Sequence, residues 1–269
     1  MRASNPRLIR IGAVLGLACV LMTFACGGGQ SNSTNASAML SGNWQMTLTQ
    51  TEPPTAEASV ETESGFLTQS GNSLAGSIVL SGATSCPGLG AASGTVSGSN
   101  IAMTVDQVGQ SVTLTGATTT DGASMAGEYS ILASGCGSST VGTFTATQVK
   151  PISGSFQATF ASGEYDTVYN FAGTLTQGPN TGMSYAALSG TMTSTNAPCI
   201  NNLSIAGEVS GTSVVFNFLA SNGSAQGQYR GTTTTDGSTL TGTYDFLAQT
   251  NGCYGDAGTV TITFQPPSS

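Results

Sequence analysis

Few side chains in this sequence could carry out catalysis. The chain of 269 residues contains no histidine, so it lacks histidine-based triads and the usual general base near neutral pH. A Ser–Lys pair would have to use Lys150. The carboxylates Glu128, Asp245 and Asp256 could supply the two acids that hydrolyse a glycosidic bond. We therefore predict that the protein is not an enzyme and keep a glycan-acting enzyme as an alternative.

Metal ligands are equally scarce. Four of the thirteen acidic residues lie between Thr51 and Glu63, and they are Glu52, Glu57, Glu61 and Glu63. Carboxylate oxygens can bind Ca²⁺, but an acidic run beside Pro53–Pro54 is typical of a solvated loop, and we predict an exposed loop here. The cysteines show no CxxC spacing, which disfavours a thiolate zinc site. The sequence predicts no metal and no cofactor.

Two similar stretches indicate an internal duplication. The run TTTDGASMAGEY at 118–129 returns as TTTDGSTLTGTY at 233–244. Asp-Gly between alternating segments is a strong β-hairpin signal and predicts a type I′ turn. Each copy ends in a tyrosine, Tyr129 or Tyr244, which could pack over a glycine or point into a cavity. These two tyrosines and Trp44, the single tryptophan, are the candidate ligand-binding residues.

The carboxylates of the two copies do not suggest a duplicated acidic site. Glu128 is matched by Thr243 in the second copy. Asp121 and Asp236 do match, but an Asp-Gly turn requires its aspartate for backbone reasons alone. We therefore interpret both aspartates as turn residues.

The duplication also selects a disulfide pattern. Four of the six cysteines lie beyond residue 26, and four cysteines allow three connectivities. Cys86 and Cys199 hold matching places in the two copies, as do Cys136 and Cys253. We predict the bonds Cys86–Cys136 and Cys199–Cys253. Each closes a loop of about 50 residues and would contribute roughly 3–4 kcal/mol to stability.

The N-terminus has the parts of a secretory leader. Three arginines precede an apolar run at 11–24 that is too short for a comfortable membrane span. The chain then reads TFAC at 23–26, followed by a small, polar, Gly-rich stretch. This resembles the bacterial lipoprotein signal, although Thr23 stands where leucine is usual. The resemblance implies a signal peptide at 1–25, a lipidated Cys26 and a flexible tether at 26–39. An ordinary signal peptide or an uncleaved anchor is the alternative.

The lipoprotein resemblance also predicts location and partners. Gly27 after the cysteine is similar to lipoproteins sent to the outer membrane, which implies an exported protein anchored by lipid in the outer membrane or at the cell surface. Loss of the leader leaves Lys150 and Arg230 against thirteen acidic residues. Nucleic acid is a poor partner for such a negative protein.

The remaining sequence divides into two sets of short strands. Apolar residues alternate with polar ones from 40 to 48 and, in the same phase, from 152 to 160, which is typical of strands with one buried face. Lys150-Pro151 interrupts the pattern, so we predict one repeat at 40–149 and a second at 150–269. The expected strands are 40–48, 65–69, 74–80, 92–97, 101–106, 111–119, 124–132 and 142–147, then 152–160, 168–177, 183–193, 203–210, 213–219, 225–234, 239–248 and 258–264.

Eight sequential strands in each repeat predict an all-β fold of two tandem antiparallel meanders. An up-and-down barrel is favoured because closure removes both exposed sheet edges; β-sandwiches are the alternative. Gly42-Asn43-Trp44 resembles the Gly-x-Trp signature of lipocalins and other calycins, and Gly154-Ser155-Phe156 is a weakened copy. The resemblance implies barrel topology. In lipocalins a late basic residue packs on the tryptophan, a place that Lys150 could take.

These features together predict a membrane-anchored cell-envelope lipoprotein without enzymatic activity. It would bind a small apolar ligand inside a barrel or a partner at the cell surface. The alternative is a structural or adhesive envelope protein whose barrels are filled by side chains. The volume left inside an eight-stranded barrel distinguishes these functions.

Overall fold

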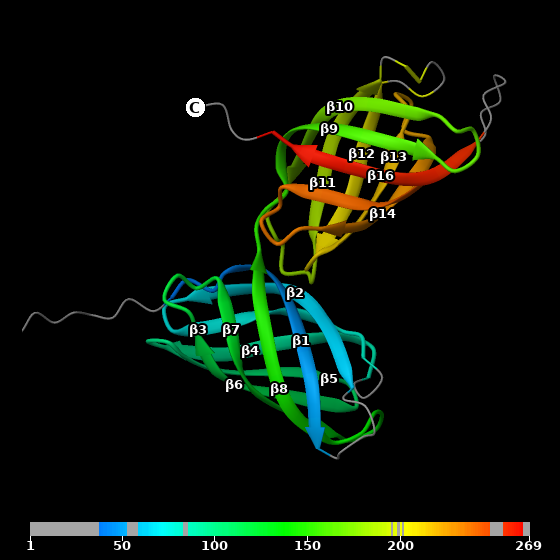
Figure 1. Ribbon diagram of the computed structural model, residues 1–269. Helices are drawn as coiled ribbons and strands as arrows, with labels where there is room; N and C mark the ends of the chain where they lie inside the picture. The colour runs from blue at the N-terminus through cyan, green and yellow to red at the C-terminus, as the bar shows by residue number, and fades with distance from the viewer. Residues whose placement is uncertain are drawn as a thin grey trace, which may run out of the picture. The chain divides into compact units, whose positions relative to one another are not determined.

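The computed structural model describes residues 38–52, 59–82, 86–194, 196–197, 200, 202–247 and 255–265. Within them the secondary structure is β-strand without helix, as predicted (Figure 1), so no described helix is long and apolar enough to cross a membrane. The first half forms β1 (Gly42–Glu52), β2 (Val60–Ser70), β3 (Ser73–Leu80), β4 (Gly88–Ser97), β5 (Asn100–Gln107), β6 (Gln110–Thr118), β7 (Ser124–Ala133) and β8 (Thr140–Val149). The second half forms β9 (Ser153–Ser162), β10 (Val168–Gln177), β11 (Ala186–Ser194), β12 (Leu203–Ser210), β13 (Ser213–Leu219), β14 (Ala225–Thr233), β15 (Thr239–Phe246) and β16 (Asp256–Phe264).

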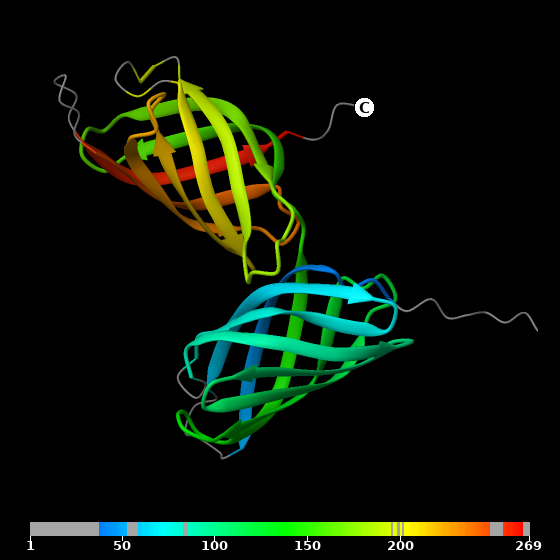
Figure 2. The same ribbon diagram turned by 180° about the vertical axis from the view of Figure 1, so that it is seen from behind.

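Each half closes into an eight-stranded antiparallel barrel. In barrel 1 the strands pair in sequence order and β8 returns to β1; in barrel 2 β16 returns to β9. Figures 1 and 2 show the strands continuing around both sides of each barrel. The predicted up-and-down barrels are confirmed and the sandwich alternative is wrong, because a closed sheet has no edge strands. The arrangement is consistent with a tandem calycin-like fold.

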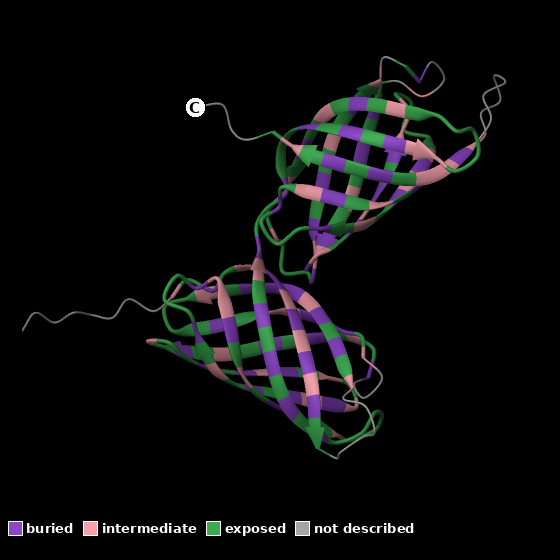
Figure 3. Ribbon diagram, in the orientation of Figure 1, coloured by how far each residue is buried: buried purple, intermediate pink, exposed green. Residues whose placement is uncertain are grey.

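Alternating burial runs along the strands of both barrels (Figure 3). On β1, Trp44, Met46 and Leu48 are buried, whereas Gln45 and Thr47 between them are partly exposed. Since successive side chains on a strand point to opposite faces, the apolar set lines the interior and the polar set forms the outer wall. This is the alternation that the sequence predicts.

The two barrels match residue by residue. The glycines that face an aromatic residue on the first strand give the clearest example. Trp44 faces Gly65 across β1 and β2, and Phe156 faces Gly173 across β9 and β10. The correspondence continues around both sheets in the same register. Every interior position of barrel 1 therefore has a counterpart in barrel 2, which confirms the duplication.

One end of each barrel carries the short turns, and we call it the turn end. In barrel 1 the β6–β7 turn packs against the chain that enters β1, because a Cβ on Gly122 would lie 2.6 Å from the Met39 carbonyl oxygen. Next along the chain, Leu40 is fully buried and accepts a 2.9 Å hydrogen bond from Trp44 Nε1. Ile152 is fully buried at the start of barrel 2.

The Asp-Gly turns differ from the predicted type I′. Only the glycine of each pair has a positive φ, 70° at both Gly122 and Gly237, whereas both aspartates keep a negative φ. The Gly122 N–H donates to the Thr119 carbonyl at 3.0 Å. Asp121 Oδ1 accepts the Ala123 N–H at 3.0 Å, so the side chain of the aspartate holds the turn without a left-handed backbone at its own position.

The opposite end of each barrel, the loop end, carries the longer connections. In barrel 1 these join β1 to β2, β3 to β4 and β7 to β8. The prediction of an exposed acidic loop up to Glu63 is wrong in part, because β2 begins at Val60. Glu61 and Glu63 are only 5% and 1% exposed; they occupy the interior phase of the strand, in line with Gly65.

Candidate ligand-binding site at the loop end of barrel 1

A disulfide bond fixes the loop end of barrel 1. Cys86, before β4, bonds Cys136, before β8, with a Cα–Cα distance of 5.8 Å, as predicted. The buried Gln110 holds this segment from within: its Oε1 accepts the Cys86 N–H at 2.8 Å and its Nε2 donates to the Cys86 carbonyl at 3.1 Å. A disulfide is typical of an oxidising, exported location. Cys26, Cys199 and Cys253 lie outside the described residues.

Polar side chains converge inside the barrel at this end. Tyr129 of β7 and Thr140 of β8 are 4% and 3% exposed. Burial raises the pKa of Tyr129 above its usual value of 10; the neighbouring Thr140 hydroxyl acts in the opposite direction, and the charge of Glu61 adds to the rise. The pKa of Tyr129 therefore responds to a hydrogen bond with Thr140 and to the charge of Glu61.

The two buried glutamates reach toward the end of β3. The Glu63 carboxylate accepts the Ser81 N–H at 2.7 Å. The Glu61 carboxylate lies against Gly82, where a Cβ would come within 1.7 Å of the carboxyl carbon. Gly82 therefore provides the space that the Glu61 side chain occupies, and the Ser81 N–H holds the Glu63 carboxylate.

The matching place in barrel 2 contains a fully bonded network. Tyr244 corresponds to Tyr129, Asp256 to Thr140 and Ser162 to Gln50. The Tyr244 phenol donates to Asp256 Oδ2 at 2.6 Å, and the Ser162 hydroxyl donates to Oδ1 at 2.6 Å. Burial and then the hydrogen bond to Asp256 raise the pKa of Tyr244 above its usual value. Both oxygens of this carboxylate therefore have donors.

The interiors of the two barrels are filled differently. Aromatic rings pack through barrel 2, with the centroids of Phe160 and Phe171 4.8 Å apart and those of Phe216 and Tyr229 4.5 Å apart. At five matching positions barrel 1 has aliphatic side chains in place of rings: Leu48 for Phe160, Met103 for Phe216, Val105 for Phe218, Leu114 for Tyr229 and Ile131 for Phe246.

At two further positions, barrel 2 has an aromatic residue and barrel 1 has a buried glutamate. Glu61 corresponds to Tyr169 and Glu63 to Phe171. The exchange runs in the other direction at Leu80, Val112 and Phe144, which correspond to Ser194, Gly227 and Val260. Near the loop end, barrel 1 thus has aliphatic side chains and carboxylates at positions where barrel 2 is aromatic.

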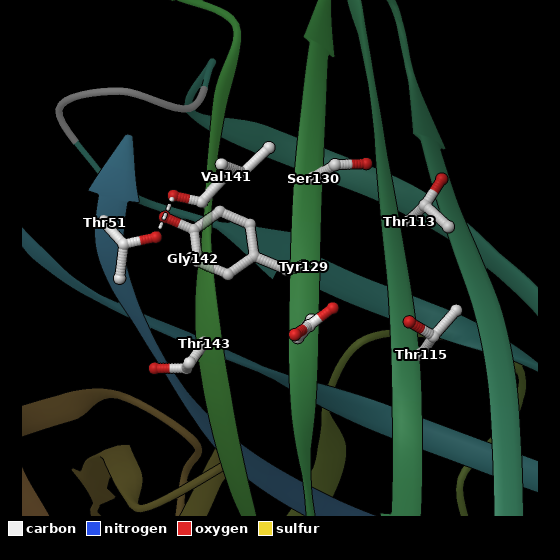
Figure 4. A pocket seen from close by; sticks show the side chains of 9 residues that line it. Thr51, Thr113, Thr115, Tyr129, Ser130, Val141, Gly142 and Thr143 are labelled. Carbon is white, nitrogen blue, oxygen red and sulfur yellow. Dashed lines mark hydrogen bonds between the residues drawn. The ribbon is translucent and has the colours of Figure 1, made fainter. Parts of the chain in front are cut away.

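A groove of about 560 Å³ lies on the outer wall of barrel 1. Figure 4 shows Thr113, Thr115 and Thr143 beside it, and the Thr51 hydroxyl donates to the Val141 carbonyl at 3.2 Å. Several hydroxyl groups and the Glu128 carboxylate therefore line this surface, together with apolar side-chain atoms. The residues that line it are Thr51, Thr113, Thr115, Glu128, Tyr129, Ser130, Val141, Gly142 and Thr143.

The three predicted ligand-binding residues do not form one site. Tyr244 lies in barrel 2. Trp44 faces Gln148 on β8, whereas Tyr129 faces Gly142, and six residues of strand separate those two positions by about 20 Å. The Tyr129 ring covers Gly142, since a Cβ there would lie 2.7 Å from its Cε1. Lys150 is exposed.

A different residue holds the chain beside Trp44. The amide of Gln148 donates to the Ser41 carbonyl at 2.8 Å and lies 2.7 Å from the position of a Cβ on Gly42. Barrel 1 therefore uses a neutral amide at the strand position that faces the tryptophan.

The proposed catalytic carboxylates are also placed separately. Glu128 lies on the outer wall of barrel 1 and Asp245 is exposed on barrel 2, whereas Asp256 faces the interior of barrel 2. Asp245 and Phe246 are neighbours on β15, and Asp256 pairs with Phe246, so the two aspartates point to opposite faces of the sheet. Among the described residues, no group of three or more acidic or cysteine side chains could hold a metal ion.

Sequence reasoning missed Glu61, Glu63 and Thr140. The signal was present: Glu61 and Glu63 continue the period-2 phase of Gly65 and Leu67, which is the phase of the barrel interior. The adjacent prolines favoured a loop and hid the start of the strand. Thr140 could be recognised as an interior residue only because it occupies the position that corresponds to Asp256 in barrel 2.

Comparisons with known proteins add little beyond the barrel architecture. No family model and no curated protein matches this chain. Among solved structures, kievitone hydratase from Nectria haematococca is 11% identical with a TM-score of 0.27, over 86% of this chain and 92% of the hydratase. A protein of unknown function of the DUF3598 family from Nostoc punctiforme is 8% identical with a TM-score of 0.25, over 83% of this chain and 96% of its own. At these TM-scores the likeness carries no argument about activity.

Proposed function

We propose that this protein is an exported, lipid-anchored cell-envelope protein without enzymatic activity, and that barrel 1 binds a small apolar ligand. Barrel 2, whose interior is filled by aromatic rings, has a structural role. The basic, apolar and TFAC segments of residues 2–26 support the leader and the lipid on Cys26. The Cys86–Cys136 bond supports export, because such bonds persist in oxidising compartments.

One observation carries the ligand proposal. At five matching interior positions, aromatic rings fill barrel 2 where barrel 1 has smaller aliphatic side chains. Barrels of equal strand number have similar diameters, so these five replacements reduce the side-chain volume inside barrel 1, while Leu80, Val112 and Phe144 are larger than their counterparts Ser194, Gly227 and Val260. A barrel of this size holds one small ligand or none.

The ligand proposal is tested by filling barrel 1 with the rings of barrel 2. The triple variant Leu48→Phe, Val105→Phe and Ile131→Phe introduces side chains that the matching positions already accommodate. We expect binding of 1-decanol, measured by titration calorimetry on the soluble Cys26→Ser protein, to fall about tenfold or more. The control Ile78→Met also introduces the residue of barrel 2, Met192, but conserves volume. Absence of decanol binding to the parent protein would exclude this function.

The lipid anchor is tested separately. Growth with an alkyne-labelled fatty acid should label the parent chain and leave the Cys26→Ser variant unlabelled. The variant should also leave the membrane fraction, because a single residue with two or more acyl chains provides stable anchoring. Labelling of the variant, or membrane retention without label, would contradict the proposed anchor.

The outer groove of barrel 1 supports a surface partner as the second candidate function. Its hydroxyl groups and Glu128 suit a polar partner. The variant Thr115→Arg would place a long cationic side chain beside Glu128, its neighbour across β6 and β7. Loss of attachment to host cells or envelope fragments, with decanol binding unchanged, would assign the function to this groove.

A further inference from the structure

The outer groove of barrel 1 lies over a row of polar side chains that crosses four strands. Thr115 of β6 pairs with Glu128 of β7, and Glu128 pairs with Thr143 of β8. Thr143 in turn pairs with Thr49 of β1. We call these four residues the polar row. Because neighbouring strands lie about 4.8 Å apart, the row presents one polar side chain at about that interval across the outer wall.

The side chains of the polar row are not used by the fold. Thr115, Glu128 and Thr143 make no side-chain hydrogen bond or ion pair to any residue that the structure describes, and the same holds for Thr113 and Ser130 beside them. Each hydroxyl can both donate and accept a hydrogen bond. Exposed groups of this kind bond to water, which a ligand with hydroxyl groups of its own can replace.

The matching wall of barrel 2 carries longer side chains. Gln228 and Arg230 stand at the positions of Thr113 and Thr115. Arg230 Nε donates to Gln228 Oε1 at 2.7 Å, and Gln228 Nε2 donates to Asn217 Oδ1 at 3.3 Å. In barrel 2 these long side chains bond to one another along the wall, whereas the two threonines of barrel 1 leave the corresponding surface open.

Charge limits the kind of ligand that the groove can bind. The sequence contains no lysine, arginine or histidine from Ile11 to Val149, and Glu128 contributes a carboxylate to the groove. An anionic ligand would therefore meet a like charge and no cation. A neutral sugar fits these groups better: its hydroxyls can bond to the polar row, and its C–H face can pack on threonine methyl groups and on Val141.

We propose that the outer groove binds a neutral, extended glycan chain that lies across β6, β7 and β8, with sugar hydroxyls bonded to Thr115, Glu128 and Thr143. The strand spacing is close to the length that one sugar adds to an extended β-1,4-linked chain, so successive sugars meet successive strands. The groove of about 560 Å³ is within the usual range of ligand sites. This inference rests on the second candidate function, the surface partner, and names the chemical class of that partner.

Four hexasaccharides test the inference. Cellohexaose and chitohexaose are neutral and extended, maltohexaose is neutral and curved, and hexagalacturonate is anionic. Each is titrated into the Cys26→Ser protein in a calorimeter at neutral pH. We expect at least one of the extended neutral chains to bind about fivefold or more tightly than maltohexaose, and hexagalacturonate to bind weakest. If neither extended chain binds more tightly than maltohexaose, the proposal is overturned.

Variants locate the site. The double variant Thr113→Gln and Thr115→Arg introduces the side chains of barrel 2 and should weaken binding of the preferred hexasaccharide about tenfold or more. Thr143→Val removes one hydroxyl but keeps a β-branched side chain that suits a strand, and should weaken binding about threefold or more. Thr95→Val removes an exposed hydroxyl from β4, on the opposite side of the barrel, and should leave the affinity unchanged. Full affinity in both the double variant and Thr143→Val would contradict the assignment.

Attachment assays separate this inference from the function on which it rests. If Thr115→Arg abolishes attachment to envelope fragments while the parent protein binds none of the hexasaccharides, the glycan is overturned and the surface partner stands. Unchanged attachment together with no hexasaccharide binding would overturn both. Decanol binding should be the same in every variant, because the groove lies on the outer wall.

Discussion

The Tyr244 phenol donates a 2.6 Å hydrogen bond to Oδ2 of Asp256 in the interior of barrel 2. The corresponding residues of barrel 1, Tyr129 and Thr140, keep the phenol and lose the carboxylate. The tyrosine is the same in both copies, whereas the group beside it differs: a carboxylate with two donors in barrel 2 and the Thr140 hydroxyl in barrel 1.

Tyr244→Phe should destabilise barrel 2. The change leaves one oxygen of the buried Asp256 without its phenol donor, and an unsatisfied buried acceptor costs about 1–3 kcal/mol. Urea unfolding followed by circular dichroism measures the loss. Tyr129→Phe is the matched control and should cost less, because Thr140 stands in barrel 1 where barrel 2 has Asp256. A larger loss at Tyr129 would show that the two tyrosines have been assigned the wrong roles.

Gly142→Ala should destabilise barrel 1 by about 1–3 kcal/mol, the usual range for an overpacked core. The added Cβ would lie 2.0 Å from the Thr49 carbonyl oxygen and 2.7 Å from Tyr129 Cε1, so the Tyr129 ring has to move. The single tryptophan, Trp44, is in this barrel, and its fluorescence reports the unfolding of barrel 1 alone. Gly135→Ala, whose Cβ would have only an ordinary 3.5 Å contact with Gly109, should leave the midpoint unchanged.

Removal of the Cys86–Cys136 bond should lower the stability of barrel 1 by about 4 kcal/mol, the loop-entropy value for the 50-residue separation. The double variant Cys86→Ala and Cys136→Ala, followed by Trp44 fluorescence in urea, gives the value. Addition of a reducing agent should shift the parent protein to the same midpoint and leave the variant unaffected. A shift of the variant would show that another disulfide controls this barrel.

The cysteines of the second copy give a separate prediction. Mass mapping of non-reduced peptides should recover Cys199 joined to Cys253. A peptide that joins Cys86 to Cys199 would contradict both the duplicated pattern and the bond seen in barrel 1.

Asp236 should titrate far below an ordinary aspartate. Hydrogen bonds from the Thr234 hydroxyl and the Ser238 N–H lower its pKa from 3.8 to about 2. Because the folded-state pKa is depressed, the ionised form stabilises the turn above pH 3.8, and this stabilisation is lost as the pH falls toward 2. Carboxyl-carbon NMR shifts measure the pKa directly. Thr234→Val removes the first donor and should raise the pKa of Asp236 toward its usual value, whereas an unchanged pKa would exclude that hydrogen bond as the cause.

The sequence predicts the architecture because its signals are local and repeated. Alternation from Trp44 to Leu48 defines a strand, and the copied Asp-Gly runs define the duplication. With both halves known, the pairing of Cys86 with Cys136 follows. The start of β2 could not be predicted in this way, because Pro53–Pro54 and the glutamates favour a loop, and only closure of the sheet places Glu61 and Glu63 in the interior.

The interior cluster of Glu61, Glu63, Tyr129 and Thr140 could not be predicted from the sequence. Its members come from β2, β7 and β8, and their convergence depends on the register that joins β8 to β1 around the barrel. No short motif contains that register. Comparison of the two copies, position by position, shows that Thr140 stands where Asp256 does and makes the difference between the barrels visible.

Closure of both sheets also bears on behaviour at high density. A chain with open sheet edges presents unpaired N–H and C=O groups that recruit further strands. In each of these barrels the last strand pairs with the first, so the sheets offer no backbone template to a neighbour. Many copies crowded side by side on one surface can therefore remain separate molecules, and association between them has to proceed through side chains.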